Sequence, residues 1–266
     1  MKHPQALVWS NEEIMPGTHL LWLKSPQVSS LAEPGQYVMI NCGEGKELPL
    51  RRPLSIHRIK NDYCAFLFKK TGKGTAWLSE RKPGNNVDLI GPLGNGFSVH
   101  PDSRNLLLVA GGIGIAPLRF LVDTALGQGK KITLLVGARS AAQLPPIETP
   151  PGRNPHSGID IQESTEDGSA GYRGMVTELI GTCKSDRIDQ VFACGPPAMY
   201  RQMSSSRNEL GLERKPTQVS LEMRMGCGMG FCYACSINTS GGLKQVCRDG
   251  PVFELADIVW DDLISK

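Results

Sequence analysis

Four of the eight cysteines in this 266-residue chain gather near its C-terminal end, and their spacing limits the fold more than any other feature. Cys227, Cys232 and Cys235 follow the pattern C-x4-C-x2-C, and Cys247 comes after a gap. Three thiolates on one tight loop can face a common centre, while a fourth closes the site from a neighbouring segment. This spacing is typical of plant-type [2Fe–2S] centres, so the end of the chain is expected to wrap around an iron–sulfur cluster.

The glycines around these cysteines support the same interpretation. Gly226, Gly228 and Gly230 allow the backbone to pass close to sulfur atoms and to direct N–H groups at them, which tunes a cluster's reduction potential. A structural zinc site is the alternative, because four cysteines also suit tetrahedral zinc. Zinc ribbons usually present two short knuckles, and here only Cys232 and Cys235 form one, so the spacing favours the cluster. Disulfides are not expected, since a chain of this length can build a core without them.

Composition excludes several classes of protein. The chain is 40% hydrophobic and 21% charged, which is typical of globular and not of disordered proteins. The net charge is only +3 without a basic block, so nucleic acid is not an expected partner. The longest wholly apolar run, residues 106–110, is far shorter than a membrane span, and the first residues carry no apolar signal segment. We therefore expect a soluble, cytoplasmic protein that does not contact a membrane.

The pattern of apolar residues changes twice along the chain. Short β-like runs separated by turn signals fill the first part, which predicts a small antiparallel barrel. Strand-like and helix-like segments then alternate, which predicts a parallel α/β sheet. The last part is rich in Gly, Met and Cys with little periodicity. The expected multi-domain β plus α/β architecture has an antiparallel β-barrel (1–100), a parallel α/β nucleotide-binding domain (101–215) and a small C-terminal [2Fe–2S] domain (216–266).

A glycine-rich turn follows the first buried strand of the α/β region. Gly111, Gly112 and Gly114 come directly after the apolar run, and Pro117 falls in the first turn of the expected helix. Glycines let the backbone approach a dinucleotide phosphate, and the helix start offers N–H groups and partial positive charge. The order G-G-x-G-x-A-P departs from the usual G-x-G-x-x-G fingerprint, and such turns also arise from packing alone. By itself this turn leaves both explanations open.

Three other stretches place special residues at the ends of expected elements. Cys194, Gly195 and Pro196 end a strand, at the edge where ligands bind in open α/β sheets. Cys194 there is either a buried thiol or a side chain beside a reacting ring. In the barrel region, Arg52 and the helix start at residues 72–75 could together clamp a pyrophosphate. Each stretch alone is more often a solvated surface or an ordinary capped helix.

The order of these motifs is more specific than any one of them. Along the chain come R-P-L-S, G-x-G-T, G-P-L-G-N-G-F, G-G-I-G-I-A-P, C-G-P and then the four cysteines. This succession resembles the ferredoxin-reductase superfamily of flavoproteins and, more narrowly, the electron-transfer subunits of dihydroorotate dehydrogenase B. The resemblance extends from about residue 35 to residue 251, and the cysteine spacing is its most discriminating part.

The resemblance implies FAD, NAD and a [2Fe–2S] cluster as cofactors and assigns residues to each. By resemblance, Arg52 contacts the FAD pyrophosphate and Ser55 lies near the reactive ring, although many superfamily members carry an aromatic residue where Leu54 stands. The implied FAD-binding residues are Arg52, Pro53, Leu54, Ser55, Leu67, Phe68, Lys69, Gly74 and Thr75. The implied NAD-binding residues are Gly111, Gly112, Gly114, Pro117, Cys194, Gly195 and Pro196. The implied cluster ligands are Cys227, Cys232, Cys235 and Cys247.

The implied chemistry belongs to the cofactors, and no catalytic side chain is expected beyond them. The resemblance implies an NAD-linked oxidoreductase subunit of pyrimidine biosynthesis, in which electrons pass from dihydroorotate through FMN, the cluster and FAD to NAD⁺. The implied partner is the FMN-containing catalytic subunit, in a heterotetramer with two copies of each. The residues alone leave NADP open, because Arg139 and Ser140 could serve a 2′-phosphate. Residues 165–169 resemble a stretch of the same family, without revealing a chemical role.

Three other interpretations stay open at this point. A diaphorase-type subunit of a hydrogenase, sulfide dehydrogenase or ferredoxin:NAD(P) oxidoreductase complex would have the same domains. A non-enzymatic redox sensor would hold the cofactors without rapid NADH turnover, and a zinc-stabilised nucleotide-binding protein would be colourless. Chain length and the compact tail with its four intact cysteines favour the pyrimidine pathway over the first of these.

Overall fold

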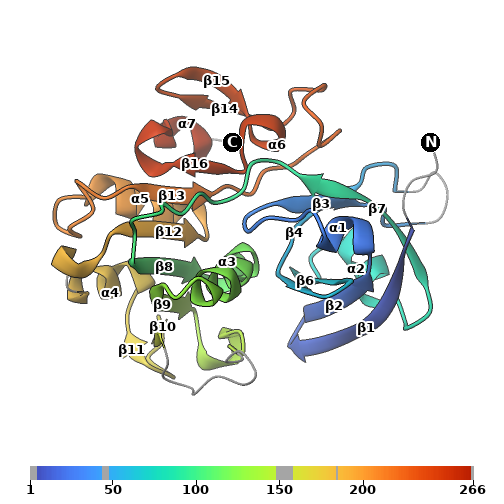
Figure 1. The fold of residues 1–266 in the computed structure, drawn as a ribbon, viewed down its shortest axis with the longest axis horizontal. Coiled ribbons are helices and arrows are strands. Elements are labelled where there is room, and N and C mark those ends of the chain that lie inside the picture. Colours follow the sequence, from blue (N-terminus) through green and yellow to red (C-terminus); the bar gives the residue numbers. More distant parts are fainter. Residues whose placement is uncertain (1–4, 44–47, 148–157, 184, 265–266) are drawn as a thin grey trace.

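The computed structural model describes residues 5–43, 48–147, 158–183 and 185–264. Two β-sheet regions lie side by side, and the C-terminal segment lies across the upper side of both (Figure 1). The first part of the chain builds the sheet at the right of this view, and the strands β8 to β13 with β16 build the sheet at the left. The cysteine-rich segment is therefore placed to contact both regions.

The first sheet is antiparallel in every described pairing and has the order β4-β3-β7-β1-β2-β6-β5. β4 also contacts β6, so the sheet curls round on itself. Alternation along β3 gives it two apolar faces, because Val38 and Ile40 enter the barrel core while Tyr37 and Met39 face the other side. Its elements are β1 (Gln5–Met15), β2 (Thr18–Lys24), α1 (Pro26–Ser29), β3 (Tyr37–Ile40), β4 (Arg52–Ser55), β5 (Arg58–Lys60), β6 (Tyr63–Lys69), α2 (Lys73–Ser79) and β7 (Asn86–Leu93).

The second sheet has the order β11-β10-β9-β8-β12-β13-β16, with parallel pairings except for the antiparallel β16. Central β8 is buried on both faces: Leu106 and Leu108 pack with α3, and Leu107 and Val109 pack with α4 and α5. This double burial explains the uninterrupted apolar run. The elements are β8 (Asn105–Gly111), η1 (Gly112–Gly114), α3 (Ile115–Gly127), β9 (Lys131–Ala138), η2 (Ala141–Gln143), β10 (Ile159–Thr165), β11 (Tyr172–Arg173), α4 (Val176–Thr182), η3 (Ser185–Arg187), β12 (Gln190–Cys194) and α5 (Pro197–Ser205).

The strand order of this sheet creates a crevice beside β8. The chain steps outward from β8 to β9 and β10 and then returns to β12 on the other side of β8. The connections that leave the carboxyl ends of β8 and β12 therefore diverge to opposite sides. In open α/β sheets such a point is where ligands bind. Both glycine-containing turns predicted from the sequence stand at this position.

The C-terminal segment joins the second sheet and also forms a small hairpin. β13 (Thr217–Ser220) and β16 (Val252–Glu254) pair with each other and extend the sheet beyond β12. Strand pairing thus ties residues of the range 216–266 to the α/β region, and the three-domain division stays a proposal. Among the described residues, no helix is both long and apolar enough to span a bilayer. The remaining elements are β14 (Ser236–Thr239), β15 (Gly242–Gln245), α6 (Val246–Asp249), η4 (Leu255–Asp257) and α7 (Trp260–Ile264).

Candidate functional site

The structure brings the four clustered cysteines together between β13 and α6. Cys227, Cys232 and Cys235 lie on the loop that precedes β14, and Cys247 lies in α6 after the β14–β15 hairpin. Cys235 and Cys247 are buried, whereas Cys232 is exposed. The hairpin therefore returns the chain so that the fourth thiol closes the site from the protein side.

Backbone N–H groups point at all four of these sulfur atoms. Such contacts stabilise thiolates, because an N–H donor favours the charged form of the acceptor. Cys227 Sγ accepts from the N–H groups of Met229 at 3.4 Å and Phe231 at 3.3 Å, Cys232 Sγ from Cys227 at 3.4 Å, Cys247 Sγ from Gly230 at 3.2 Å, and Cys235 Sγ from Cys247 at 3.4 Å.

The four thiols form two pairs. Cys227 contacts Cys232, and Cys235 contacts Cys247, through their side chains. Burial acts to raise the pKa of Cys227, but backbone N–H donors outweigh it and lower that pKa to about 6. Burial and the contact with Cys235 raise the pKa of Cys247 to about 12. No three His, Cys, Asp or Glu side chains among the described residues converge on one point as a single metal ion requires.

Local backbone geometry explains the residues between the cysteines. At Gly226 an added Cβ would meet Cys232 Sγ at 3.0 Å, so this position needs glycine for the close approach of sulfur. Gly228 has a φ of +71°, and an added Cβ would meet the Met39 side chain of the barrel at 2.6 Å. Tyr233 also has a positive φ, of 58°, which is strained for a residue with a side chain. The loop is thus wrapped tightly and rests on β3.

The G-P-L-G-N-G-F stretch, residues 91–97, begins in the last part of β7 and contacts the cysteine segment. The side-chain amide of Asn95 donates to the carbonyl oxygens of Arg248 at 3.2 Å and Asp249 at 3.1 Å. Its backbone N–H donates to Gly250 O at 2.6 Å. An added Cβ at Gly94 would meet Gly250 O at 2.7 Å, so the two segments lie in direct contact. The motif is a clamp between the barrel and the residues that follow Cys247.

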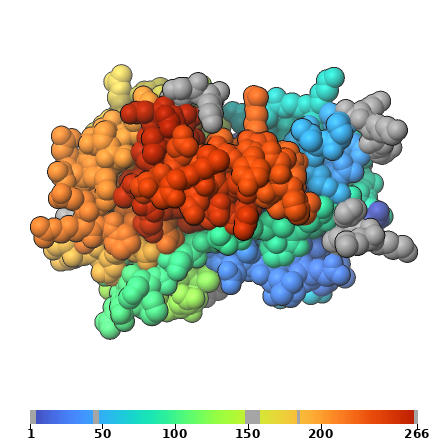
Figure 2. Space-filling view, turned by 90° about the horizontal axis from the view of Figure 1, so that it is seen from above, coloured from blue at the N-terminus to red at the C-terminus, as the bar shows by residue number. Residues whose placement is uncertain are grey.

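Large apolar side chains surround the outer side of the cysteine loop. Phe231 is 79% exposed, Tyr233 61% and Met229 48%, and all three lie within a few residues of exposed Cys232. We call Met229, Phe231 and Tyr233 the apolar rim. Seen from above, the C-terminal part of the chain forms the upper surface of the molecule across both sheet regions (Figure 2). Soluble chains seldom gather exposed aromatic residues without a binding role.

The expected flavin strand and phosphate helix meet in the structure. An added Cβ at Gly74 would lie 2.6 Å from Arg52 Nε, so the guanidinium rests directly on the start of α2. Arg51 is committed elsewhere, because it forms a bidentate pair with Asp88 at 2.6 and 3.1 Å. Arg52 is thus the guanidinium available at this helix start, where it donates a hydrogen bond to Leu50 O.

The other predicted flavin residues differ in what they can offer. Pro53, Leu54 and Ser55 are half-buried along β4, which runs antiparallel to β3. The Thr75 hydroxyl accepts from Thr71 N at 2.9 Å and Gly72 N at 3.2 Å, so it caps the turn and leaves only its backbone for a ligand. Phe68 is buried in the barrel core, where its ring stacks on His19 at 5.5 Å. Leu67 faces the second sheet, and Lys69 lines a cavity at the edge of that sheet, described below.

Close backbone approach explains most glycines of the two turns. At Gly114 an added Cβ would meet Cys194 O at 1.9 Å, and at Gly111 it would meet Pro196 Cδ at 2.7 Å. Gly112 is different: its φ is +55° and nothing lies within 4 Å of an added Cβ. Cys194 is 1% exposed and burial raises its pKa, so the structure favours the buried-thiol interpretation.

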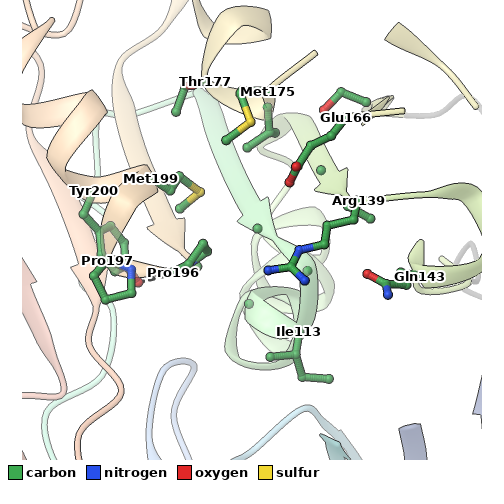
Figure 3. A pocket seen from close by; sticks show the side chains of 18 of the residues that line it. Ile113, Arg139, Gln143, Glu166, Met175, Thr177, Pro196, Pro197, Met199 and Tyr200 are labelled. Carbon is green, nitrogen blue, oxygen red and sulfur yellow. Dashed lines mark hydrogen bonds between the residues drawn. The ribbon is translucent and has the colours of Figure 1, made fainter. Parts of the chain in front are cut away.

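A cavity of about 630 Å³ opens at the carboxyl ends of β8, β9, β10, β12 and β13. Among the predicted residues, Lys69, Gly111, Gly112, Gly114, Gly195 and Pro196 line it, while Pro117 is buried in α3 and Cys194 lies behind the wall. The β1–β2 turn contributes Met15, Pro16 and Thr18, so the barrel closes one side. Figure 3 shows Arg139 and Glu166 projecting into this cavity opposite Pro196 and Pro197.

The loop after β10 presents Glu166 to the cavity. Thr165 Oγ1 donates to Ala170 O at 2.7 Å, and Asp167 Oδ1 accepts from the Ser169 hydroxyl at 2.6 Å. Ser169 Oγ accepts in turn from Ala141 N at 2.7 Å. The polar side chains of this loop are therefore used internally, except that of Glu166, for which no hydrogen bond or ion pair occurs among the described residues. These hydrogen bonds hold the loop that carries the Glu166 carboxylate in place.

Two curated relatives and two family models decide which family this chain belongs to. The iron–sulfur cluster binding domain of dihydroorotate dehydrogenase B matches residues 222–259, and the oxidoreductase NAD-binding domain matches residues 108–205. The dihydroorotate dehydrogenase B (NAD(+)) electron transfer subunit of Desulforamulus reducens is 36% identical over 93% of this chain and 95% of its own length. The subunit of that name from Bacillus caldolyticus is 36% identical over 95% and 96%. This chain belongs to the electron transfer subunits of dihydroorotate dehydrogenase B.

Solved structures share the fold of this electron transfer subunit. The structure of an NADH-dependent reduced ferredoxin-NADP oxidoreductase, described for flavin-based electron bifurcation, is 33% identical over 98% of this chain and 91% of that chain, with a TM-score of 0.85. A ferredoxin NADP⁺ reductase from Neisseria gonorrhoeae with bound FAD and NADP has a TM-score of 0.63 over 79% and 92% of the two chains. At 15% identity the latter shows the fold alone. The fold class expected from the sequence is confirmed.

Family membership confirms the resemblance that the order of motifs indicated. The chain is an electron transfer subunit of an NAD-linked oxidoreductase of pyrimidine biosynthesis, and it serves a catalytic partner subunit. The individual cofactor-binding residues stay predictions, as does the cytoplasmic location.

Several residues that line the cavity of this electron transfer subunit have no motif in the sequence. Glu222 lines the cavity with its side chain exposed to solvent, and partial desolvation by the surrounding protein raises its pKa. It stands two residues after β13, so the rule that ligands bind at carboxyl ends of strands could have found it. Met175 and Trp260 come from loops and helices distant in sequence, and no local signal marks them.

Proposed function

We propose that this subunit exchanges electrons with an FMN-containing catalytic partner at the apolar rim and with NAD in the 630 Å³ cavity. The complex would contain two copies of each subunit. The observation that carries the proposal is the set of backbone N–H groups aimed at four thiols, in a chain that also has a nucleotide-sized cavity.

The cysteine site suits a [2Fe–2S] cluster in its chemistry. Four thiols with N–H donors are what a cluster with thiolate ligands requires. The thiolates of Cys227, Cys232, Cys235 and Cys247 would hold the cluster, which would supply single-electron transfer. A tetrahedral zinc site also takes four thiolates. The C-x4-C-x2-C spacing, with only one short knuckle, favours the cluster over zinc.

The barrel offers a cradle for FAD between β4 and α2. Arg52 and the backbone at Gly74 and Thr75 would bind the pyrophosphate, because the guanidinium already rests on the helix start. Ser55 and Leu67 would face the ring system from β4 and β6. Bound FAD supplies the exchange of a hydride with the nicotinamide and of single electrons with the cluster.

The cavity suits NAD more than NADP. Gly112 opens its backbone to the cavity where the 13-residue helix α3 begins, and a helix start favours a pyrophosphate. Glu166 would bind the hydroxyl groups of the adenosine ribose and repel a 2′-phosphate. Arg139 on the neighbouring strand end would hold the phosphates or the adenine ring. The Glu166 carboxylate would thus distinguish NAD, whose ribose hydroxyl groups it binds, from NADP, whose 2′-phosphate it repels.

The apolar rim is the docking surface that we assign to the catalytic partner. It surrounds the exposed thiol Cys232, so an acceptor bound there would lie beside the cluster ligands. Exposed aromatic side chains near the centre of a surface are typical anchors of protein interfaces. The three residues of the apolar rim do not line the cavity, so a partner bound at the rim would leave the cavity free for the nucleotide.

Anaerobic preparation of the holoprotein tests this function. We expect iron, sulfide and FAD in the ratio 2:2:1, which is set by one cluster and one flavin. NADH should bleach the cluster absorbance, and Cys235→Ser should abolish this bleaching while NADH-dependent reduction of ferricyanide survives. Cys183→Ser is the matched control, since Cys183 lies in the α/β region and its thiol donates to Leu179 O. Bound zinc, or a preparation without iron and flavin, would refute the proposal.

A second candidate function has one observation in its favour, the 33% identity to an NADH-dependent reduced ferredoxin-NADP oxidoreductase. In that case the subunit would serve a ferredoxin-linked complex in place of a dihydroorotate-oxidising one. Co-purification with an FMN protein that turns over dihydroorotate distinguishes the first function from the second. The two relatives at 36% identity favour the first.

A further inference from the structure

Tyr37 lies on β3, between β4 of the proposed FAD site and the cysteine site. Its backbone pairs with Ser55 in the β3–β4 ladder, and its side chain leaves the barrel on the side opposite Val38. It is 2% exposed and packs in the same cluster as Cys235 and Cys247. One residue thus lies between the two proposed cofactor sites.

The Tyr37 hydroxyl is placed between two carbonyl groups of the cysteine segment. It lies 3.0 Å from Gly228 O and 3.1 Å from Cys247 O, and it can donate its single proton to either. These carbonyls belong to the two parts of the chain that supply thiols, the loop before β14 and α6. The phenol therefore joins both parts to the barrel.

One of these contacts continues to a sulfur atom. The peptide group that carries Gly228 O also carries the N–H of Met229, which donates to Cys227 Sγ at 3.4 Å. Hydrogen bonds in series polarise one another, so donation to the carbonyl strengthens the N–H donor of the same peptide. The series runs from the Tyr37 hydroxyl through one peptide unit to the Cys227 thiol. A phenylalanine at position 37 would keep the packing and remove the first bond of the series.

We propose that Tyr37 is a positioning residue that tunes the reduction potential of the centre held by the four cysteines, through the Gly228–Met229 peptide. The proposal rests on the proposed function, since it requires a redox-active cluster at these thiols. Hydrogen bonds to cluster sulfur favour the reduced, more negatively charged state. Removing the hydroxyl therefore lowers the potential of the cluster and leaves that of the flavin unchanged.

The test is a redox titration of the anaerobic holoprotein carrying Tyr37→Phe, followed by the EPR signal of the reduced cluster. We expect the ratio of reduced to oxidised cluster at a fixed potential to fall by up to about twofold, because the lost hydroxyl acts on the sulfur only by polarising the Met229 N–H. Tyr172→Phe is the matched control, because it removes a hydroxyl that donates to Glu178 Oε2 at 2.9 Å on the far edge of the second sheet. An unchanged cluster potential in Tyr37→Phe overturns the proposal.

A second measurement keeps the test decisive if Tyr37→Phe fails to retain its cluster. Site-specific 3-fluorotyrosine at position 37 keeps the ring and hydroxyl but makes the hydroxyl a stronger donor, so the cluster potential should rise. The coupling of exchangeable protons to the reduced cluster should change in the same preparation. No shift, or a fall, contradicts the proposal. Iron and flavin analysis of the unmodified protein separately decides the proposed function, so the two failures are distinguishable.

Discussion

The cysteine loop and the nucleotide cavity are built in opposite ways. Around the loop, 21 consecutive residues from Cys227 to Cys247 contain all four thiols and the N–H groups that point at them. The wall of the cavity comes from the β1–β2 turn, from the ends of β8, β9, β10, β12 and β13 in the second sheet, and from α7. A metal centre needs ligands on a short tether, whereas a dinucleotide needs an extended edge that distant segments form together.

The same residue type has different uses in the two regions. In the cysteine loop, Gly226 gives a sulfur atom room to approach, so its role belongs to the ligand geometry. Beside the cavity, Gly114 gives room to the carbonyl of Cys194, so its role is packing between two turns. Only Gly112 in that turn has open space in place of its missing side chain. A glycine-rich motif is therefore not one signal but a mixture of packing and binding positions.

Substitution of Gly114 should give the largest effect and separate packing from binding. An alanine Cβ would meet a carbonyl oxygen at 1.9 Å, so we expect Gly114→Ala to cost about 3 kcal/mol of unfolding free energy or more. Gly112→Ala should cost only about 1 kcal/mol, for its positive φ, and should raise KM for NADH. Chemical denaturation and NADH kinetics measure both.

Cluster content gives the control for this pair of variants. The cysteine loop packs against β3 and against the turn after β7, not against Gly112. Gly112→Ala should therefore keep its iron while nucleotide binding weakens. Equal loss of stability in the two variants, or an unchanged KM in Gly112→Ala, would show that the two glycines do not differ as their surroundings indicate.

How far the sequence predicts each region follows from the same contrast. The cysteine spacing locates the candidate metal site because its ligands are close in sequence, and the uninterrupted run at β8 predicts a strand buried on both faces. The pairing of β13 with β16 lies outside local patterns, since 31 residues separate Ser220 from Val252 along the chain. The cavity walls at Met15 and Glu222 depend on how the barrel and the second sheet meet. No periodicity encodes that contact.

The apolar rim offers the next largest effect and tests whether the loop serves a protein partner as well as a metal. Phe231→Ser keeps the backbone N–H that donates to Cys227 Sγ, so the cluster should stay in place. Loss of a 79% exposed aromatic anchor should weaken binding to the catalytic subunit about tenfold or more. Isothermal titration between the separately purified subunits measures this affinity.

A matched substitution on the barrel keeps this result specific. Leu31 is 69% exposed and lies beyond α1, outside the apolar rim, so Leu31→Ser should leave the affinity unchanged. Equal affinities of Phe231→Ser and the unmodified subunit would move the docking surface away from the cysteine loop and leave the metal site without an adjoining partner.

Nucleotide choice gives the smallest effect and depends on one carboxylate of the cavity. Glu166→Gln keeps the shape of the side chain and removes its charge, so kcat/KM for NADH should fall about tenfold, as expected for a hydrogen bond to a charged group. The same value for NADPH should rise, because a 2′-phosphate is no longer repelled and Arg139 remains beside it. Asp160→Asn, at the exposed start of β10, should change neither value. If both nucleotides lost activity in proportion, Glu166 would act on cavity structure alone, and selection of the ribose would have to come from the β9 side of the cavity.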